Sequence, residues 1–131
     1  MKVLYLGSAD DKSDAPWLKK GETYTVLSLY AEKMGVSYRI LSGDPPTPVL
    51  HSAKIFEVLD GSIPSSWRVG INDAGEFMEL TPEPWLEPGF WERYFDQDDQ
   101  AIELFEQEVQ KMDQQNLSES EAENSGQPPI N

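Results

Sequence analysis

The sequence contains no cysteine, and only one histidine and ten basic residues occur among its 131 positions. Without cysteine the chain can have no disulfide framework, no thiolate zinc site and no cysteine nucleophile. A single histidine also excludes metal sites that need two or three imidazole ligands. Because the lack of cysteine fits a reducing compartment, we expect a cytoplasmic protein.

Long apolar runs are absent as well. The N-terminal run, residues 2–6, is too short for the core of a signal peptide, and no later stretch approaches the roughly 18 apolar residues of a membrane span. Glycines occur singly, so no phosphate-binding loop opens a helix. The sequence therefore predicts no signal peptide, no membrane contact and no cofactor.

Acidic residues are abundant, and they are unevenly distributed. The formal net charge is -14, yet residues 1–50 carry six basic and six acidic side chains and are neutral. The remaining residues carry four basic against eighteen acidic side chains. A field of this sign repels phosphates and anionic lipids and attracts basic partners, with screening over about 8–10 Å. We therefore expect a basic protein as partner, with no direct binding to nucleic acid.

Short strand-forming runs alternate with turn residues through the first 80 positions. Strands are expected at residues 2–6, 22–30, 36–40, 49–51, 55–59, 67–71 and 76–80. The second and third runs predict a hairpin, and the turn residues 72–75 predict another between the last two. Loops are expected at residues 9–16 and 44–48, because prolines in the latter lack the amide donors of a central strand.

The C-terminal third has a different pattern. Residues 81–95 combine three prolines with five aromatic side chains, which predicts an irregular aromatic strap. Asp96 or Asp98 can cap a following helix, whose apolar face is expected to hold Ile102, Phe105, Val109 and Met112. Residues after Met112 are too polar to recover their ordering entropy. We predict one globular domain over residues 1–112 and a disordered acidic tail over residues 113–131.

The histidine and the acidic residues form no recognisable catalytic or metal-binding pattern in the sequence. His51 has no nucleophile and orienting acid that the sequence singles out, which favours a structural role. Asp10, Asp11 and Asp14 share a loop but lack the spacing of a calcium-binding loop. With so many acids, some pair will meet the separation of a glycosidase by chance. We therefore expect no catalytic residues, no metal site and a chain that is not an enzyme.

The segment from Glu76 to Glu108 carries eleven carboxylates and one cation, Arg93. Tryptophan commonly anchors binding hot spots, and surrounding carboxylates accelerate the capture of a basic partner. The expected partner-binding residues are Glu76, Glu79, Glu83, Glu87, Glu92, Asp96, Asp98, Asp99, Trp85 and Trp91. The alternative role of the aromatic side chains is to plug the open end of a barrel.

Several sequence pieces resemble small, uncharacterised bacterial proteins with an SH3-like barrel, some of them similar to immunity proteins of toxin systems. The pieces are residues 15–18, 20–26, 38–40, 56–58, 63–67 and 88–92. Together with the strand pattern, the resemblance implies a mainly β (α+β) fold. In that fold a small SH3-like antiparallel β-barrel precedes the aromatic strap and one C-terminal amphipathic helix.

Four functions remain open at this point. The first is a non-enzymatic immunity or inhibitor protein that covers the basic groove of a nuclease-like toxin with its acidic surface. The second is an acidic mimic of nucleic acid that binds DNA-processing or defence proteins. The third is a hydrolase with two carboxylates, and the fourth is an SH3-like peptide-binding scaffold that uses Tyr24, Tyr30 and Tyr38.

Overall fold

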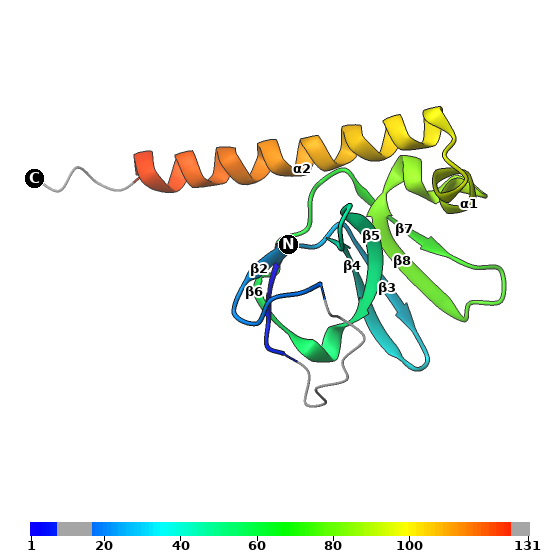
Figure 1. Cartoon of the computed structure of the whole chain (residues 1–131), viewed down its shortest axis with the longest axis horizontal. Coiled ribbons are helices and arrows are strands. Elements are labelled where there is room, and N and C mark those ends of the chain that lie inside the picture. The colour runs from blue at the N-terminus through cyan, green and yellow to red at the C-terminus, as the bar shows by residue number, and fades with distance from the viewer. Residues whose placement is uncertain (8–16, 127–131) are drawn as a thin grey trace, which may run out of the picture. The chain divides into compact units, whose positions relative to one another are not determined.

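The structure, a computed structural model, describes residues 1–7 and 17–126, with side chains as far as residue 113 (Figure 1). The chain divides into two compact units, Met1–Leu86 and Glu87–Asn131. We call them the β unit and the helical unit. The division lies at Leu86, whereas the sequence predicted one domain as far as Met112. The loop predicted at residues 9–16 lies outside the described residues.

The described part of the β unit contains eight strands in two antiparallel sheets (Figure 1). The strands are β1 Lys2–Tyr5, β2 Thr23–Thr25, β3 Ser28–Glu32, β4 Gly35–Ser42, β5 Thr47–Ser52, β6 Phe56–Asp60, β7 Trp67–Ile71 and β8 Phe77–Pro82. One sheet has the order β2-β1-β6 and the other the order β5-β4-β3-β8-β7. The predicted mainly β fold with antiparallel sheets is thus confirmed.

The single strand expected at residues 22–30 is two strands, β2 and β3, that belong to different sheets. The buried residues Val26 and Leu27 connect them. Their amide groups still donate hydrogen bonds, to the carbonyl oxygens of Met1 (3.0 Å) and Arg39 (2.8 Å). The prediction of one strand was wrong because an apolar pattern indicates which residues are buried but does not indicate which sheet a strand joins.

Both predicted hairpins are present, as β3 with β4 and as β7 with β8. In the second, the Asn72 side-chain oxygen accepts hydrogen bonds from the amides of Glu76 (2.7 Å) and Phe77 (3.0 Å). Pro48 lies inside β5 and not in the expected loop over residues 44–48. Proline is tolerated there because β5 is the outermost strand of its sheet.

The interior of the β unit is built from side chains of both sheets and of the short 3-10 helix η2, Glu83–Leu86. Val3, Val26, Ile40 and Trp85 are each at most 2% exposed. Another 3-10 helix, η1 Ala53–Ile55, connects β5 to β6. Trp85 therefore belongs to the core of this unit.

The expected irregular strap over residues 81–95 is largely regular. It contains the end of β8, the helix η2 and a short α-helix, α1 Phe90–Phe95. Gly89 precedes α1 in a left-handed conformation, with φ of 77°. The prediction was wrong here because all three prolines lie before Gly89, so the residues that follow are free to form helical hydrogen bonds.

Helix α2, Asp99–Gly126, begins where the sequence predicted. The Asp98 carboxylate caps it by accepting a hydrogen bond from the amide of Ala101 at 3.0 Å. Phe105 and Met112 are buried as expected, whereas Ile102 and Val109 are half-buried. Ala101 and Glu108 complete the buried row, so its position on the helix differs from the predicted one.

Helix α2 also continues to Gly126, beyond the predicted start of a disordered tail at residue 113. Residues 127–131 lie outside the described part of the chain. The composition of the tail is polar, but extending a helix that has already formed costs less than nucleating one. A prediction from amino-acid composition does not include this difference between extending and nucleating a helix.

Candidate functional site

The ten residues predicted to bind a partner are divided between the two units. Glu76, Glu79, Glu83 and Trp85 lie in the β unit, and Glu87, Trp91, Glu92, Asp96, Asp98 and Asp99 lie in the helical unit. Within the helical unit, most of them lie on α1 or between α1 and the first residue of α2.

In the β unit, Glu76 is exposed beside the turn between β7 and β8, and Glu83 is exposed at the start of η2. Trp85 is only 2% exposed, so its indole offers almost no surface to a partner. Of the four predicted residues in this unit, Glu76 and Glu83 are the ones positioned for contact.

Glu79 is half-buried in β8, and its charge interacts with that of Arg39 in β4. Burial raises the pKa of the Glu79 carboxyl, and the positive charge of Arg39 opposes that shift. Burial likewise lowers the pKa of the Arg39 guanidinium to about 10, against the opposing effect of Glu79. The sequence pattern did not reveal this coupling because strand β3 lies between the two strands in the sheet. Glu79 is therefore engaged within the sheet.

The helical unit has two basic residues, and each forms an ion pair with a carboxylate. Arg93 contacts Glu87 at 3.1 Å, and Lys111 contacts the buried Glu108 at 3.2 Å. Among the described side chains of this unit, the other carboxylates form no ion pair. Those that are exposed are Glu92, Asp96, Asp99, Glu103, Glu106 and Asp113. Their negative charge is balanced by no cation of the same unit.

Aromatic rings join α1 to α2. The Trp91 ring lies 5.0 Å from Phe90, 5.6 Å from Tyr94 and 6.0 Å from Phe105, measured between centroids. Phe90 and Phe105 are buried and Trp91 is half-buried, which assigns the cluster mainly to packing. Phe95, whose ring centroid is 6.1 Å from that of Trp91, is 50% exposed and was missing from the predicted set.

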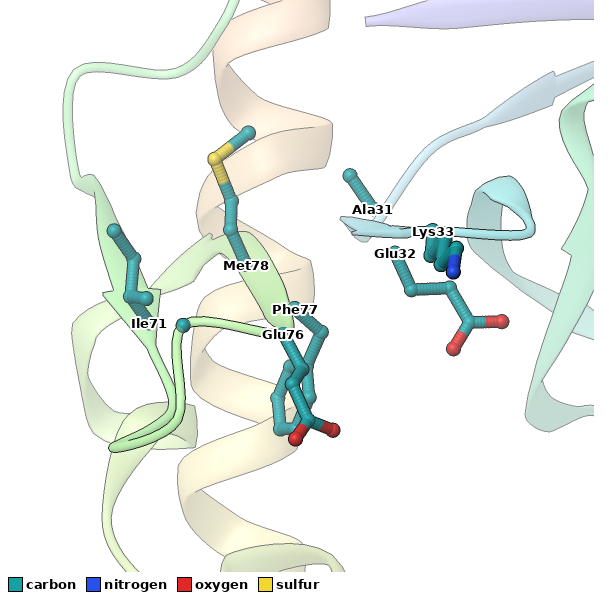
Figure 2. A pocket seen from close by; sticks show the side chains of 8 residues that line it. Ala31, Glu32, Lys33, Ile71, Glu76, Phe77 and Met78 are labelled. Carbon is teal, nitrogen blue, oxygen red and sulfur yellow. The ribbon is translucent and has the colours of Figure 1, made fainter.

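An open pocket of about 890 Å³ lies at the ends of the two hairpins in the β unit (Figure 2). Its lining residues are Ala31, Glu32, Lys33, Ile71, Gly75, Glu76, Phe77 and Met78. Glu76 alone belongs to the predicted set. The sequence analysis missed this pocket because its walls come from segments about forty residues apart, which only the pairing of β3 with β8 brings together.

His51 and Ser42 are both buried, and the His51 Nε2 atom lies 3.0 Å from the Ser42 hydroxyl oxygen. Burial lowers the pKa of the His51 imidazole, so the neutral ring is favoured. In the described part of the chain, no acidic side chain accepts a hydrogen bond from this ring. The geometry supports the structural role expected for His51.

Among the described residues, no three acidic, histidine or cysteine side chains form a group that could hold a metal ion. No helix of the described chain is long and apolar enough to cross a membrane. In comparisons with known proteins, no family model, curated protein or solved structure matches this chain. The resemblance to SH3-like immunity proteins therefore stays a prediction.

Proposed function

We propose that this chain is a non-enzymatic protein-binding module that engages a basic protein through the exposed carboxylates of its helical unit. One observation carries the proposal. The only two cations of that unit, Arg93 and Lys111, are paired with Glu87 and Glu108, which leaves the exposed carboxylates without internal compensation. A basic partner would supply the missing charge and would be attracted over about one Debye length.

We also propose an SH3-like arrangement for the β unit. Three features support it: β1 pairs with both β2 and β6, the chain changes sheets between β2 and β3, and a 3-10 helix connects β5 to β6. The β7–β8 hairpin then extends the second sheet beyond β3. Because folds of this kind host many functions, this arrangement does not select one.

The partner class that fits the charge best is a toxin of nuclease type, neutralised in the cytoplasm. A nuclease must attract phosphate, so the groove that holds its substrate is positively charged. An acidic module gains both steering and complementarity at such a groove. The role of the chain would then be that of an immunity or inhibitor protein.

A second candidate, a mimic of nucleic acid, is favoured by a row of carboxylates on α2. Asp99, Glu103, Glu106 and Asp113 recur at spacings of four, three and seven residues, which places them on one face of the helix. All four are exposed. This function predicts several unrelated DNA-binding partners, whereas an immunity protein has one cognate partner.

Both candidates can be tested by neutralising carboxylates in one unit at a time. The test variant carries Glu92→Gln, Asp96→Asn and Asp99→Asn in the helical unit. The control carries Glu22→Gln, Asp44→Asn and Glu57→Gln, three exposed sites of the β unit, and it loses the same charge. Pull-down from a nuclease-treated native lysate identifies the partner, and calorimetry with that purified partner gives the affinities.

We expect the test variant to bind roughly ten-fold or more weakly and the control to stay within about three-fold of the unmodified chain. Affinity should also fall as salt is raised. Recovery of no basic protein, or an equal loss of affinity in both variants, would contradict the proposal. Recovery of several unrelated DNA-binding proteins would select the mimic.

A further inference from the structure

Four strands lie at the edges of the two sheets, and three of them carry features that discourage pairing with another chain. Strand β2 has only three residues, and β5 contains Pro48. Strand β6 carries Glu57 and Asp60, and its register with β1 shifts at one position. Strand β7 has neither proline nor acidic side chain.

The one charged residue of β7, Arg68, is folded back onto its own chain. Its Nη1 atom donates hydrogen bonds to the carbonyl oxygens of Ser65 and Trp67, both at 2.9 Å. The Trp67 amide donates to the Pro64 carbonyl oxygen at 3.1 Å. The backbone groups of Trp67, the first residue of β7, therefore have hydrogen-bond partners within the chain. The Arg68 guanidinium is held by the same segment, so it does not block the approach of another strand to the rest of β7.

Val69 and Ile71, further along β7, have backbone groups that point away from the sheet. The Asn72 amide donates to the Phe77 carbonyl oxygen at 3.3 Å, which fixes the alternation of hydrogen bonds in the hairpin. Residues 68, 70 and 72 consequently bond to β8, whereas Val69 and Ile71 direct their N–H and C=O groups outward. No strand in the described part of the chain pairs with that side of β7.

The side chains of this edge are apolar and open to solvent. Val69 is 56% exposed and Ile71 is 63% exposed. In the register, Ile71 lies opposite Met78, and Met78 lies opposite Ala31, so these three side chains share one face of the sheet. Figure 2 shows Ile71 and Met78 extending from neighbouring strands on one side of the pocket.

Carboxylates lie close to this apolar strip, and Glu32 and Glu76 extend toward the opposite face of the sheet (Figure 2). Glu32 and Glu76 line the same pocket, and exposed Asp73 lies in the adjoining turn, against one cation, Lys33. A second copy of the chain would bring another formal charge of -14 to the edge, which disfavours self-pairing. An extended segment with aliphatic residues at alternate positions and basic residues between them would match both the apolar strip and the carboxylates close to it.

We propose that β7 binds such an extended basic segment of a partner protein by strand addition, with backbone hydrogen bonds at Val69 and Ile71. The inference rests on the proposed function for the sign of the partner's charge. Strand addition gives the partner a second contact, on the β unit, which requires an extended partner segment with apolar side chains at alternate positions. Binding to the carboxylates of the helical unit requires neither an extended conformation nor alternating apolar side chains.

The test uses the full chain and a synthetic ten-residue peptide that alternates lysine with valine. Amide exchange measured by NMR should slow about ten-fold or more at Val69 and Ile71 when the peptide is saturating, with no change in β5 or β6. A peptide that alternates glutamate with valine should have no effect. Slowed exchange in β6, or no change in β7, would overturn the proposal.

A matched pair of variants separates this edge from general charge attraction. Ile71→Lys on β7 should weaken binding of the lysine–valine peptide about ten-fold, while Val58→Lys on β6 should stay within about two-fold. Val58 is 46% exposed, so both substitutions add one charge at a solvent-exposed position. Equal effects of the two variants would overturn the proposal.

Three further outcomes distinguish the edge of β7 from the carboxylates of the helical unit. Shifts confined to α1 and α2 would overturn strand addition at β7 and leave the proposed function standing. Protection of Val69 and Ile71 that depends on protein concentration, without peptide, would replace the partner segment by a second copy. The variant with Glu92→Gln, Asp96→Asn and Asp99→Asn gives the third outcome. If it no longer binds the basic protein but the peptide still slows amide exchange at β7, the edge of β7 binds independently of the helical unit.

Discussion

The β unit and the helical unit each contain twelve acidic residues, but the β unit has eight basic residues and the helical unit has two. The first spreads its charges over 86 residues around a core formed by side chains such as Ile40 and Trp85. The second has 45 residues and contains one aromatic cluster, in which the Trp91 ring packs against Phe90 and Phe105. The same residue type therefore has different roles, because a carboxylate inside a sheet must be compensated there, whereas exposed carboxylates remain available to a partner.

Glu79 and Glu92 illustrate this contrast. Glu79 lies in a sheet, where burial raises its pKa and Arg39 partly offsets the cost of its charge. Glu92 is exposed on α1 and has no basic partner in its unit. Substitutions at chosen positions in the two units can test whether residues that pack in the interior differ in effect from residues that are exposed.

The largest expected effect comes from the core of the β unit. Trp85→Ala removes a side chain that is 2% exposed and should lower the free energy of unfolding by about 3–5 kcal/mol. Phe95→Ala, at a position that is 50% exposed in the helical unit, should cost less than about 1 kcal/mol. Chemical denaturation measures both. Equal losses would show that the difference in exposure between Trp85 and Phe95 does not reflect a difference in packing.

A smaller loss is expected where η2 packs against β7. A Cβ atom added at Gly70 would lie 2.5 Å from Leu86 Cδ2, so Gly70→Ala should destabilise the β unit by about 1–3 kcal/mol. Leu86→Ala removes the obstructing atom, so the double variant should lose less than the sum of the single ones. Additive losses in a denaturation cycle would mean that the two sites do not contact each other.

In the helical unit, the helix cap is expected to contribute about 1 kcal/mol. Asp98→Ala removes the oxygen that accepts the Ala101 amide and should destabilise the start of α2 by that amount. Asp99→Ala serves as the control, because this neighbouring carboxylate is exposed, the cap bond is accepted by Asp98, and the substitution changes the charge equally. Amide exchange at the first turn of α2 measures the difference. A similar effect of both substitutions would attribute it to charge alone.

The smallest effect is the dependence of β-unit stability on pH. Because burial lowers the pKa of His51 below 6.5, the unfolded chain takes up the proton first, and stability falls as pH drops below about 6.5. The slope should stay well under the limit of about 1.4 kcal/mol per pH unit that one proton sets. His51→Gln should flatten it in denaturation curves recorded at pH 7 and pH 5.5.

Glu79 should act in the opposite direction. Its pKa is raised by burial, so the folded chain takes up a proton before the unfolded one, and stability rises as pH falls through the folded pKa toward 4.5. Glu79→Gln should remove this gain and leave the effect of His51 in place. If stability falls equally with pH in both variants, the two pKa shifts are not the cause.

Local signals predicted much of the fold. Turn residues between 72 and 75 predicted the second hairpin, and the Asn72 side chain closes it as that chemistry requires. Asp96 and Asp98 were the two predicted caps of the C-terminal helix, and Asp98 is the one that caps α2. These features depend on neighbours within a few residues, so the sequence contains the information directly. The break between β2 and β3, the position of Pro48 in an edge strand and the length of α2 depend on distant pairing or on helix propagation, which local rules omit.

For the candidate site, the sequence by itself determined the charge: the excess of carboxylates after residue 50 and the scarcity of cations are properties of composition. Tertiary structure decided which of those carboxylates are free to act. Sheet pairing places Arg39 so that its charge acts on Glu79, ion pairs engage Glu87 and Glu108, and burial removes Trp85 from the surface. The edge of β7 likewise exists only through strand order, because an edge is defined by the strand that is missing beside it.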